Sequence, residues 1–252
     1  MLSTPFPWLA GEPQAWQLLV MAGVVLAAAV AQGIGGIGFA MLAAPVAALF
    51  FPQLAPGPLL TLGGFISLLG ALRERAAIDW RYVGYTLTGR CAGTLLAVYA
   101  MARFAPDLMG TLFALAILAG VAISVAGVRL PCSPRSLCGA GLASGVMGTL
   151  TSIGAPPLAL VMQHETPARL RATIGIILFI GASFSLGMLN LTGHYGVPQF
   201  LLSVFLLPFL LLGFALSGRL KAVLAPGVVR RFLLAICAAG AVVVLVQARW
   251  PG

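Results

Sequence analysis

The chain has 252 residues, of which 61% are hydrophobic and only 8% are charged, and its mean hydropathy is +1.08. A soluble domain carries about 25% charged residues, so this composition excludes a water-soluble globular protein and predicts an integral membrane protein. The net charge of +9 is typical of cytoplasmic loops that face anionic lipid, and no nucleic-acid partner is expected.

Hydrophobic segments follow one another along almost the whole chain. They cover residues 15–32, 37–52, 56–72, 82–102, 107–128, 136–148, 150–163, 172–190, 198–218 and 228–248. Several reach the roughly 20 residues that cross a bilayer, whereas the first, second, sixth and seventh are shorter and rich in Gly, Pro or Thr. The first and second segments make one short pair, and the sixth and seventh make another. Each pair forms either two tilted spans or one hairpin of half-helices. The predicted fold class is therefore an all-α polytopic membrane protein with about 8–10 spans.

Basic residues gather on one side of this predicted membrane protein. No Lys or Arg occurs in the first sixteen residues, so the first segment is expected to remain as a span rather than be cleaved as a signal peptide. The side of the N-terminus holds only Arg103 and Arg249. The opposite side holds Arg73, Arg75, Arg81, Arg129, Arg135, Arg169, Arg171, Arg219, Lys221, Arg230 and Arg231. By the positive-inside rule that side is cytoplasmic, which predicts a multi-pass protein of the cell (inner) membrane with both termini outside.

The two halves of the chain resemble each other, which divides the single membrane domain into repeats at 1–128 and 129–252. An offset of 112 relates Gly33 to Gly145 and Gly36 to Gly148, together with Pro45 to Pro157, Thr61 to Thr173 and Gly84 to Gly196. An offset of 120 relates Gly93 to Gly213, Pro106 to Pro226 and Gly120 to Gly240. Each half has an odd number of segments, so the second begins on the opposite side of the membrane. This predicts an inverted-topology repeat, as in many secondary transporters.

One Gly-rich stretch near the start of each half interrupts the hydrophobic segments. The two stretches read "QGIGGIGFAMLAAP" from Gln32 and "ASGVMGTLTSIGAPPLAL" from Ala143. Irregular backbone inside a membrane survives only against protein or a wet cavity, and a helix that restarts there presents free N–H groups to an anion. We therefore expect a helix break and a substrate site at each stretch. Tight helix packing is the alternative explanation for the glycines.

Arg90 lies inside a predicted span, nine residues or about 13 Å from Arg81 along a helix. An intramembrane Arg indicates a functional site, and a guanidinium suits an oxyanion; the alternative is a structural Arg held by backbone carbonyls. For Arg171, beside the second stretch, a cytoplasmic anchor at the lipid surface is favoured over a functional role, which stays open. The residues expected to bind substrate are Gln32, Gly33, Gly35, Gly36, Pro45, Arg90, Ser144, Gly145, Gly148, Thr149, Thr151, Ser152 and Pro157.

The same residues resemble the TauE/SafE-type sulfite exporter family of anion permeases. The first stretch is similar to that family's Gly-rich opening motif, and the second, with "LRATIGIILF" from Leu170, is similar to its second copy. The common Gly-Gly-Pro-Pro of that copy is here Gly154-Ala155-Pro156-Pro157. The resemblance implies transport of sulfite, sulfonates or related sulfur-containing anions.

The predicted function is accordingly secondary transport of small anions by alternating access, with the lipid bilayer as surroundings and the oligomeric state left open. No enzyme activity and no cofactor are expected. No metal site is expected either, because the four cysteines lack metal-ligand spacing, namely Cys91, Cys132, Cys138 and Cys237. Two alternatives remain. One is a non-transporting membrane assembly or sensor subunit. The other is an intramembrane serine protease that would use Ser144 with His194.

Overall fold

A computed structural model of the chain describes residues 15–51, 54–104, 106–125, 130–220, 234–240 and 242. These residues form helices, and no strand occurs among them, so the all-α prediction is confirmed for this part of the chain. The helices are α1 (Ala15–Gly35), α2 (Phe39–Phe50), α3 (Gly57–Arg73), the 3-10 helix η3 (Arg75–Ala77), α4 (Trp80–Arg103), α5 (Pro106–Val125), α6 (Pro134–Thr151), α7 (Ala155–Val161), α8 (Pro167–Leu191) and α9 (Val197–Leu220). Residues 234–240 are also helical, and the rest of the predicted 228–248 segment lies outside the described residues, apart from residue 242.

Three described helices are long and apolar enough to cross a membrane, namely Trp16–Gly35, Pro167–Leu191 and Val197–Leu220. Shorter apolar helices cover Phe39–Ala48, Gly57–Arg73 and Thr111–Val125. α4 is 24 residues long, but its arginines lower its hydropathy. Of the basic residues predicted on the two sides, Arg129, Lys221, Arg230, Arg231 and Arg249 lie outside the described residues.

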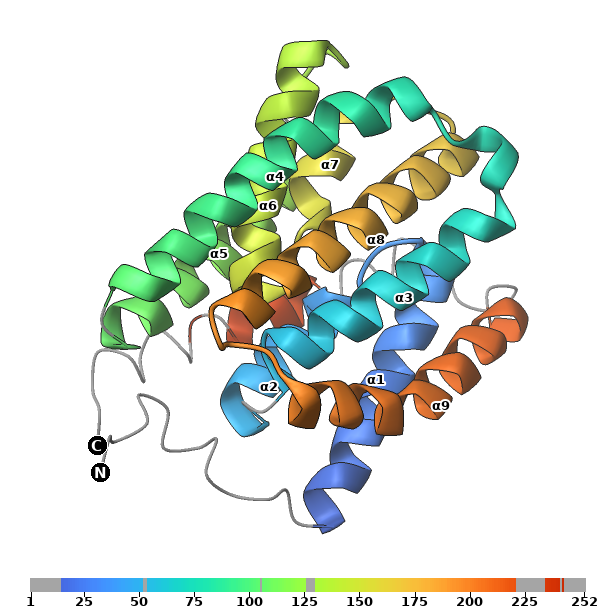
Figure 1. The fold of residues 1–252 in the computed structure, drawn as a ribbon. Coiled ribbons are helices and arrows are strands. Elements are labelled where there is room, and N and C mark those ends of the chain that lie inside the picture. The colour runs from blue at the N-terminus through green and yellow to red at the C-terminus, as the bar shows by residue number, and fades with distance from the viewer. Residues whose placement is uncertain are drawn as a thin grey trace.

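The helices pack in pairs, with α4 on α6, α1 on α9 and α3 on α8, so that α3, α8 and α4 run side by side in Figure 1. The α4–α6 crossing brings two backbones into contact. A Cβ at Gly89 or Gly93 of α4, or at Gly141 or Gly145 of α6, would overlap the backbone of the opposite helix. Small residues permit this approach between membrane helices.

Apolar side chains form two main buried clusters. The first includes Met21, Phe39, Leu62 and Leu210 and joins α1, α2, α3 and α9. The second joins α4, α6, α7 and α8 around Leu158. α3 contributes to the first cluster and α8 to the second, and the two helices also share a third cluster that includes Leu60 and Leu189.

Both expected helix breaks are present. α1 ends at Gly35 before α2 begins at Phe39, and α6 ends at Thr151 before α7 begins at Ala155. The residues that directly follow α1 and α6 both have positive φ, which is 79° at Gly36 and 65° at Ser152. Their N–H groups bond back to the carbonyls of Gln32 and Gly148 at 2.6 and 2.8 Å. The breaks are thus 116 residues apart, four more than the offset that the glycines suggested.

Candidate functional site

A cavity lies where the two helix breaks meet. Residues 38–41 at the start of α2 and residues 152–155 of the α6–α7 break line it, together with residues of α3, α4 and α8. The cavity offers about 40 Å³ to the centres of water-sized spheres. One water needs about 10–15 Å³ on this measure, so the cavity has room for a few waters or a small anion. We call it the Arg90 cavity.

Arg90 reaches this cavity from α4 and is only 2% exposed. Its guanidinium donates a hydrogen bond to Ser144 Oγ, and Nη1 lies 3.4 Å from the Ser144 carbonyl oxygen. The buried Nε has no hydrogen-bond partner within the described part of the chain. No carboxylate among the described residues pairs with Arg90 either. Leaving a buried charged donor unsatisfied is costly, so this guanidinium is suited to a bound counter-ion.

The second break is tied directly to Arg90. Ser144 of α6 accepts from Arg90 and donates to the Gly154 carbonyl at 2.6 Å. Two glycines leave room for the guanidinium, because a Cβ would lie 3.1 Å from Arg90 Nη2 at Gly148 and 2.8 Å from Nη1 at Gly154. The sequence therefore identified Arg90, Ser144 and Gly148 as neighbours of one site.

Gly181 of α8 is a site residue that the sequence analysis missed. A Cβ at this position would overlap Arg90 Nε, so only glycine lets the arginine lie in its observed position. The signal was one more glycine inside an apolar segment, which alone does not distinguish a site from helix packing.

The first break is held by Gln32 near the end of α1. Its side chain is buried, and Oε1 accepts a hydrogen bond from the Phe39 N–H at 2.8 Å. Nε2 donates to Ser67 Oγ of α3 at 3.1 Å. The first N–H groups of a helix have no partner within the helix, so Gln32 satisfies one of them for α2. Ser67 is a second residue that the sequence analysis missed.

The hydroxyls expected to face an anion are mostly used by the protein itself. Thr149 is fully buried and shares hydrogen bonds of 3.2 and 2.9 Å with Thr94 and Ser185. Thr151 donates to the carbonyl of residue 147 in the preceding helical turn. Ser152 lines the Arg90 cavity, although its Oγ donates to the carbonyl of residue 56 at 3.1 Å.

The glycines of the first stretch serve different purposes. Gly33 contacts α9, since a Cβ there would overlap Ser217 Oγ. Gly36 has positive φ, and a Cβ would also overlap the Arg171 side chain, so glycine is required on both counts. Gly35 is exposed, with nothing within 4 Å of the position of a Cβ.

The remaining predicted residues do not line the Arg90 cavity. Pro45 lies inside α2 against Gly240, and Pro157 is buried in α7. Gly145 contacts the backbone of Arg90 rather than its side chain. The protease alternative also lacks its geometry, because Ser144 is engaged with Arg90 and Gly154 whereas His194 is hydrogen-bonded to the exposed Thr192 hydroxyl at 3.1 Å.

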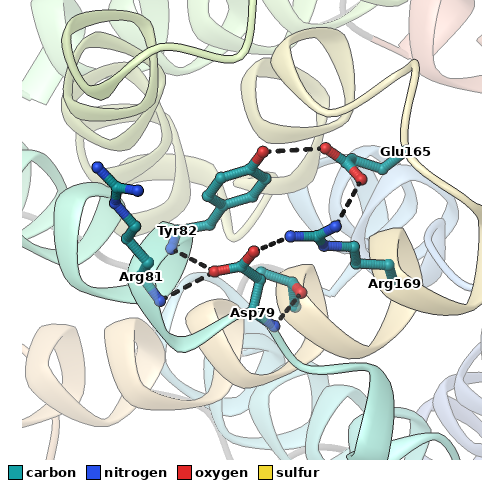
Figure 2. Close-up of polar contacts among 6 residues, drawn as sticks. Asp79, Arg81, Tyr82, Glu165 and Arg169 are labelled. Carbon is teal, nitrogen blue, oxygen red and sulfur yellow. Dashed lines mark hydrogen bonds and ion pairs between the residues drawn. The ribbon is translucent and has the colours of Figure 1, made fainter.

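A polar cluster joins the start of α4 to the start of α8, as Figure 2 shows. Asp79 accepts from the N–H groups of Arg81 and Tyr82 and forms an ion pair with Arg169. Arg169 also lies 3.5 Å from Glu165, which accepts from the Tyr82 hydroxyl. Burial raises the pKa of Asp79, but the hydrogen bonds from Arg169 and the two N–H groups hold the pKa below its ordinary value overall. The cluster ties together two segments far apart in the sequence.

A second cavity lies beyond Gln32, between α1, α3, α8 and α9. Arg171 lines it and pairs with Glu74, with a second hydrogen bond of 3.2 Å between Arg171 Nε and the carboxylate. Arg171 was interpreted as an anchor at the lipid surface, whereas its side chain lies across the first helix break against Gly36. We call this the Arg171 cavity.

The chain is similar to a known protein family over nearly its whole length. A family model described as "Sulfite exporter TauE/SafE" matches residues 21–244. The chain belongs to the TauE/SafE sulfite exporter family. This match covers nearly the whole chain and confirms the resemblance seen in the Gly-rich stretches, and the family is one of membrane transporters. No curated protein and no solved structure matched significantly.

Proposed function

We propose that the chain exports small oxyanions, namely sulfite or sulfonates, and that the Arg90 cavity is its substrate site. The observation that carries this proposal is a buried guanidinium that has no carboxylate partner among the described residues and that faces a cavity between two helix breaks. A charge inside a membrane protein is expensive unless it is paired. A bound oxyanion supplies the missing charge, and the planar guanidinium fits two of its oxygens.

The proposed mechanism is alternating access between two inverted repeats, 1–128 and 129–252. The helix packing supports it, because the α1–α9 pair corresponds to the α6–α4 pair, and each pair joins one helix of the first repeat to one helix of the second. In the same correspondence α3 and α8 are each other's counterparts, and they pack together. The broken pair α1–α2 corresponds to the broken pair α6–α7. Two such halves rocking about a central site would expose it to each side in turn.

The proposed direction follows from the membrane voltage. The loops with most arginines are predicted to lie in the cytoplasm, which puts both termini outside. A cell interior is electrically negative, and moving one charge through 100 mV is worth about 2.3 kcal/mol. Export of an anion is therefore driven without a coupling ion.

Proteoliposomes that contain only this chain test the proposal. Initial flux of radiolabelled sulfite, kept anaerobic, is measured under a potassium–valinomycin clamp, with sulfonates and sulfate as competitors. We expect flux that follows the imposed potential without a pH gradient or Na⁺. Absence of flux would contradict transport and favour the assembly or sensor alternative. Flux that requires a proton or Na⁺ gradient and ignores voltage would contradict the proposed energetics.

Two matched variants of α8 test the site itself. Gly181→Ala places a methyl group where Arg90 Nε lies, so the guanidinium must leave its position and flux should fall about tenfold, the loss of roughly one charge-assisted hydrogen bond. Gly187→Ala makes the same change at an exposed position with nothing within 4 Å, and flux should be unchanged. Equal flux in both variants would remove Arg90 from the site.

A further inference from the structure

The Arg171 cavity is separate from the proposed substrate site and carries charges of its own. It offers about 60 Å³ to the centres of water-sized spheres, compared with about 40 Å³ for the Arg90 cavity. Two arginines line it, Arg73 at the end of α3 and Arg171 near the start of α8. Both belong to the side that the basic residues predict to be cytoplasmic.

The charges that line this cavity do not cancel. Arg171 is paired with Glu74, whereas Arg73 has no carboxylate partner within the described ranges. The central carbon of the Arg73 guanidinium instead lies 3.8 Å from the centre of the Phe214 ring, over the ring. Two arginines and one glutamate leave one positive charge in excess. A guanidinium carries five N–H donors, so Arg73 can still donate to an oxyanion while it lies over the Phe214 ring.

Gln32 and Ser67 line both cavities, and their hydrogen bond of 3.1 Å lies between them. An anion that passes from the Arg171 cavity to Arg90 must therefore separate these neutral side chains. Both can donate a hydrogen bond to the anion while it passes. The route leads from one arginine-lined cavity to another with one polar contact between them.

We propose that the Arg171 cavity is a second anion-binding site, at the cytoplasmic mouth, which takes the small oxyanion before it reaches Arg90. Arg73 is its primary ligand, and Arg171 joins when the anion displaces Glu74. This proposal rests on the proposed function. A positively charged mouth raises the local concentration of anions and their association rate, and two weaker sites in series let an anion leave as well as enter.

Everted membrane vesicles test the mouth site, because they turn the cytoplasmic face outward. Uptake of radiolabelled sulfite is compared with vesicles that lack the chain, at constant ionic strength. Arg73→Gln should raise the apparent KM about three- to tenfold, the size of a steering effect, with little change in maximal rate. The matched control is Arg75→Gln, which removes the same charge two residues further along the chain, at an exposed position that does not line the cavity, and it should leave the KM within about twofold. Glu74→Gln should lower the KM because Arg171 loses its competing carboxylate.

A thiol at position 70 measures the cavity without transport. Gly70 lines the cavity with nothing within 4 Å of a Cβ, so Gly70→Cys fits. The purified variant is treated with anionic methanethiosulfonate ethylsulfonate or its cationic trimethylammonium counterpart, and modification of that peptide is read by mass spectrometry. When the rate of each reagent is divided by its rate with a free thiol, the thiol at position 70 should react faster with the anionic reagent. Arg73→Gln should reduce this preference about three- to tenfold and Arg75→Gln should not. Millimolar methanesulfonate should protect the thiol.

The outcomes separate the two proposals. Equal effects of Arg73→Gln and Arg75→Gln on the KM and on the reagent preference would overturn the mouth site while wild-type flux leaves the transport function standing. A wild-type chain without flux would overturn the transport function, and the Gly70→Cys reaction would still decide whether anions bind here. An unprotected thiol with no preference for the anionic reagent would overturn the mouth site.

Discussion

Each of the two helix breaks begins at a residue with positive φ, but the two breaks differ in the chemistry that supports them. In the α1–α2 break, the neutral side chain of Gln32 bridges the Phe39 N–H and Ser67. In the α6–α7 break, Ser144 donates to the Gly154 carbonyl and accepts from the guanidinium of Arg90. The first break is thus satisfied from within its own half, whereas the second uses a charged residue from the other half.

This difference shows that two helix breaks in one protein need not be supported by the same chemistry. A break leaves backbone N–H and C=O groups to be satisfied, and any nearby polar side chain can do it. A neutral amide holds the break that adjoins both cavities, where an anion must pass. The charge lies at the other break, where an anion is proposed to stop. The predictions below test this division of roles.

The largest effect is expected from removing the charge at the second break. Arg90→Gln should reduce sulfite flux about 10- to 100-fold, because a charge-assisted hydrogen bond to the anion is worth about 1.5–3 kcal/mol. Arg90→Lys should retain some of the flux, since it keeps the charge without the planar fork. Flux is measured in proteoliposomes, and a monodisperse elution profile checks folding. Wild-type kinetics in Arg90→Gln would make the charged break a purely structural feature.

Loss of the Gln32 side chain at the α1–α2 break should destabilise the protein more than loss of the Ser144 hydroxyl at the α6–α7 break. Gln32→Leu leaves the buried Phe39 N–H without its acceptor and should cost about 2 kcal/mol. Ser144→Ala should cost about 1 kcal/mol, because Arg90 Nη1 retains the Ser144 carbonyl at 3.4 Å. Thermal unfolding in one detergent compares the two variants. A larger loss in Ser144→Ala would reverse the assignment of roles.

Alanine substitutions at Gly33 and Gly35 of the first stretch should differ sharply in their effect on stability, although the two residues are close in sequence. Gly33→Ala would overlap Ser217 of α9 and should cost about 1–2 kcal/mol, and Ser217→Gly should recover some of that loss. Gly35→Ala meets open space and should be neutral or gain up to about 1 kcal/mol from helix propensity. The same unfolding assay measures both variants. Equal costs would mean that the backbone of this break, rather than α1–α9 packing, requires the glycines.

The smallest effect is expected outside both breaks, in the polar cluster at Asp79. Its pKa is lower in the folded protein than in the unfolded chain, so its ion pair with Arg169 stabilises the protein above the ordinary carboxyl pKa of about 4 and is lost as pH falls through the folded pKa. Asp79→Asn keeps the helix cap and should cost at most about 1 kcal/mol at pH 7, because Arg169 is 41% exposed. Asp79→Ala loses the cap as well and should cost about 1 kcal/mol more.

Melting temperatures between pH 3 and pH 7 check this prediction. The difference between wild type and Asp79→Asn should be largest at neutral pH and should shrink below about pH 4, as the carboxylate is protonated. Sulfite flux at pH 7 should be unchanged in Asp79→Asn, because the residue contacts neither cavity. A difference that grows on acidification would contradict the direction of the pKa shift.

The sequence alone determined the membrane class, the family and the two helix breaks, and it singled out Arg90, which the structure places at a cavity. These features are local or compositional: few charges exclude a soluble fold, clustered glycines weaken a helix where they stand, and an arginine far from a segment end is unusual at any position. The hydroxyls of Thr149 and Thr151, which the sequence offered as donors to an anion, are hydrogen-bonded within the protein, and a local motif does not reveal such partners.

Only the tertiary structure decided which residues meet. Ser67 holds Gln32, Gly181 makes room for Arg90, and Glu74 pairs with Arg171 across 97 positions of sequence. Each of these contacts depends on where two helices cross, and the crossing point is set by the small residues and side-chain shapes of both helices together. No single segment contains that information, so the partners of the site emerge only when α3, α4 and α8 pack around the two breaks.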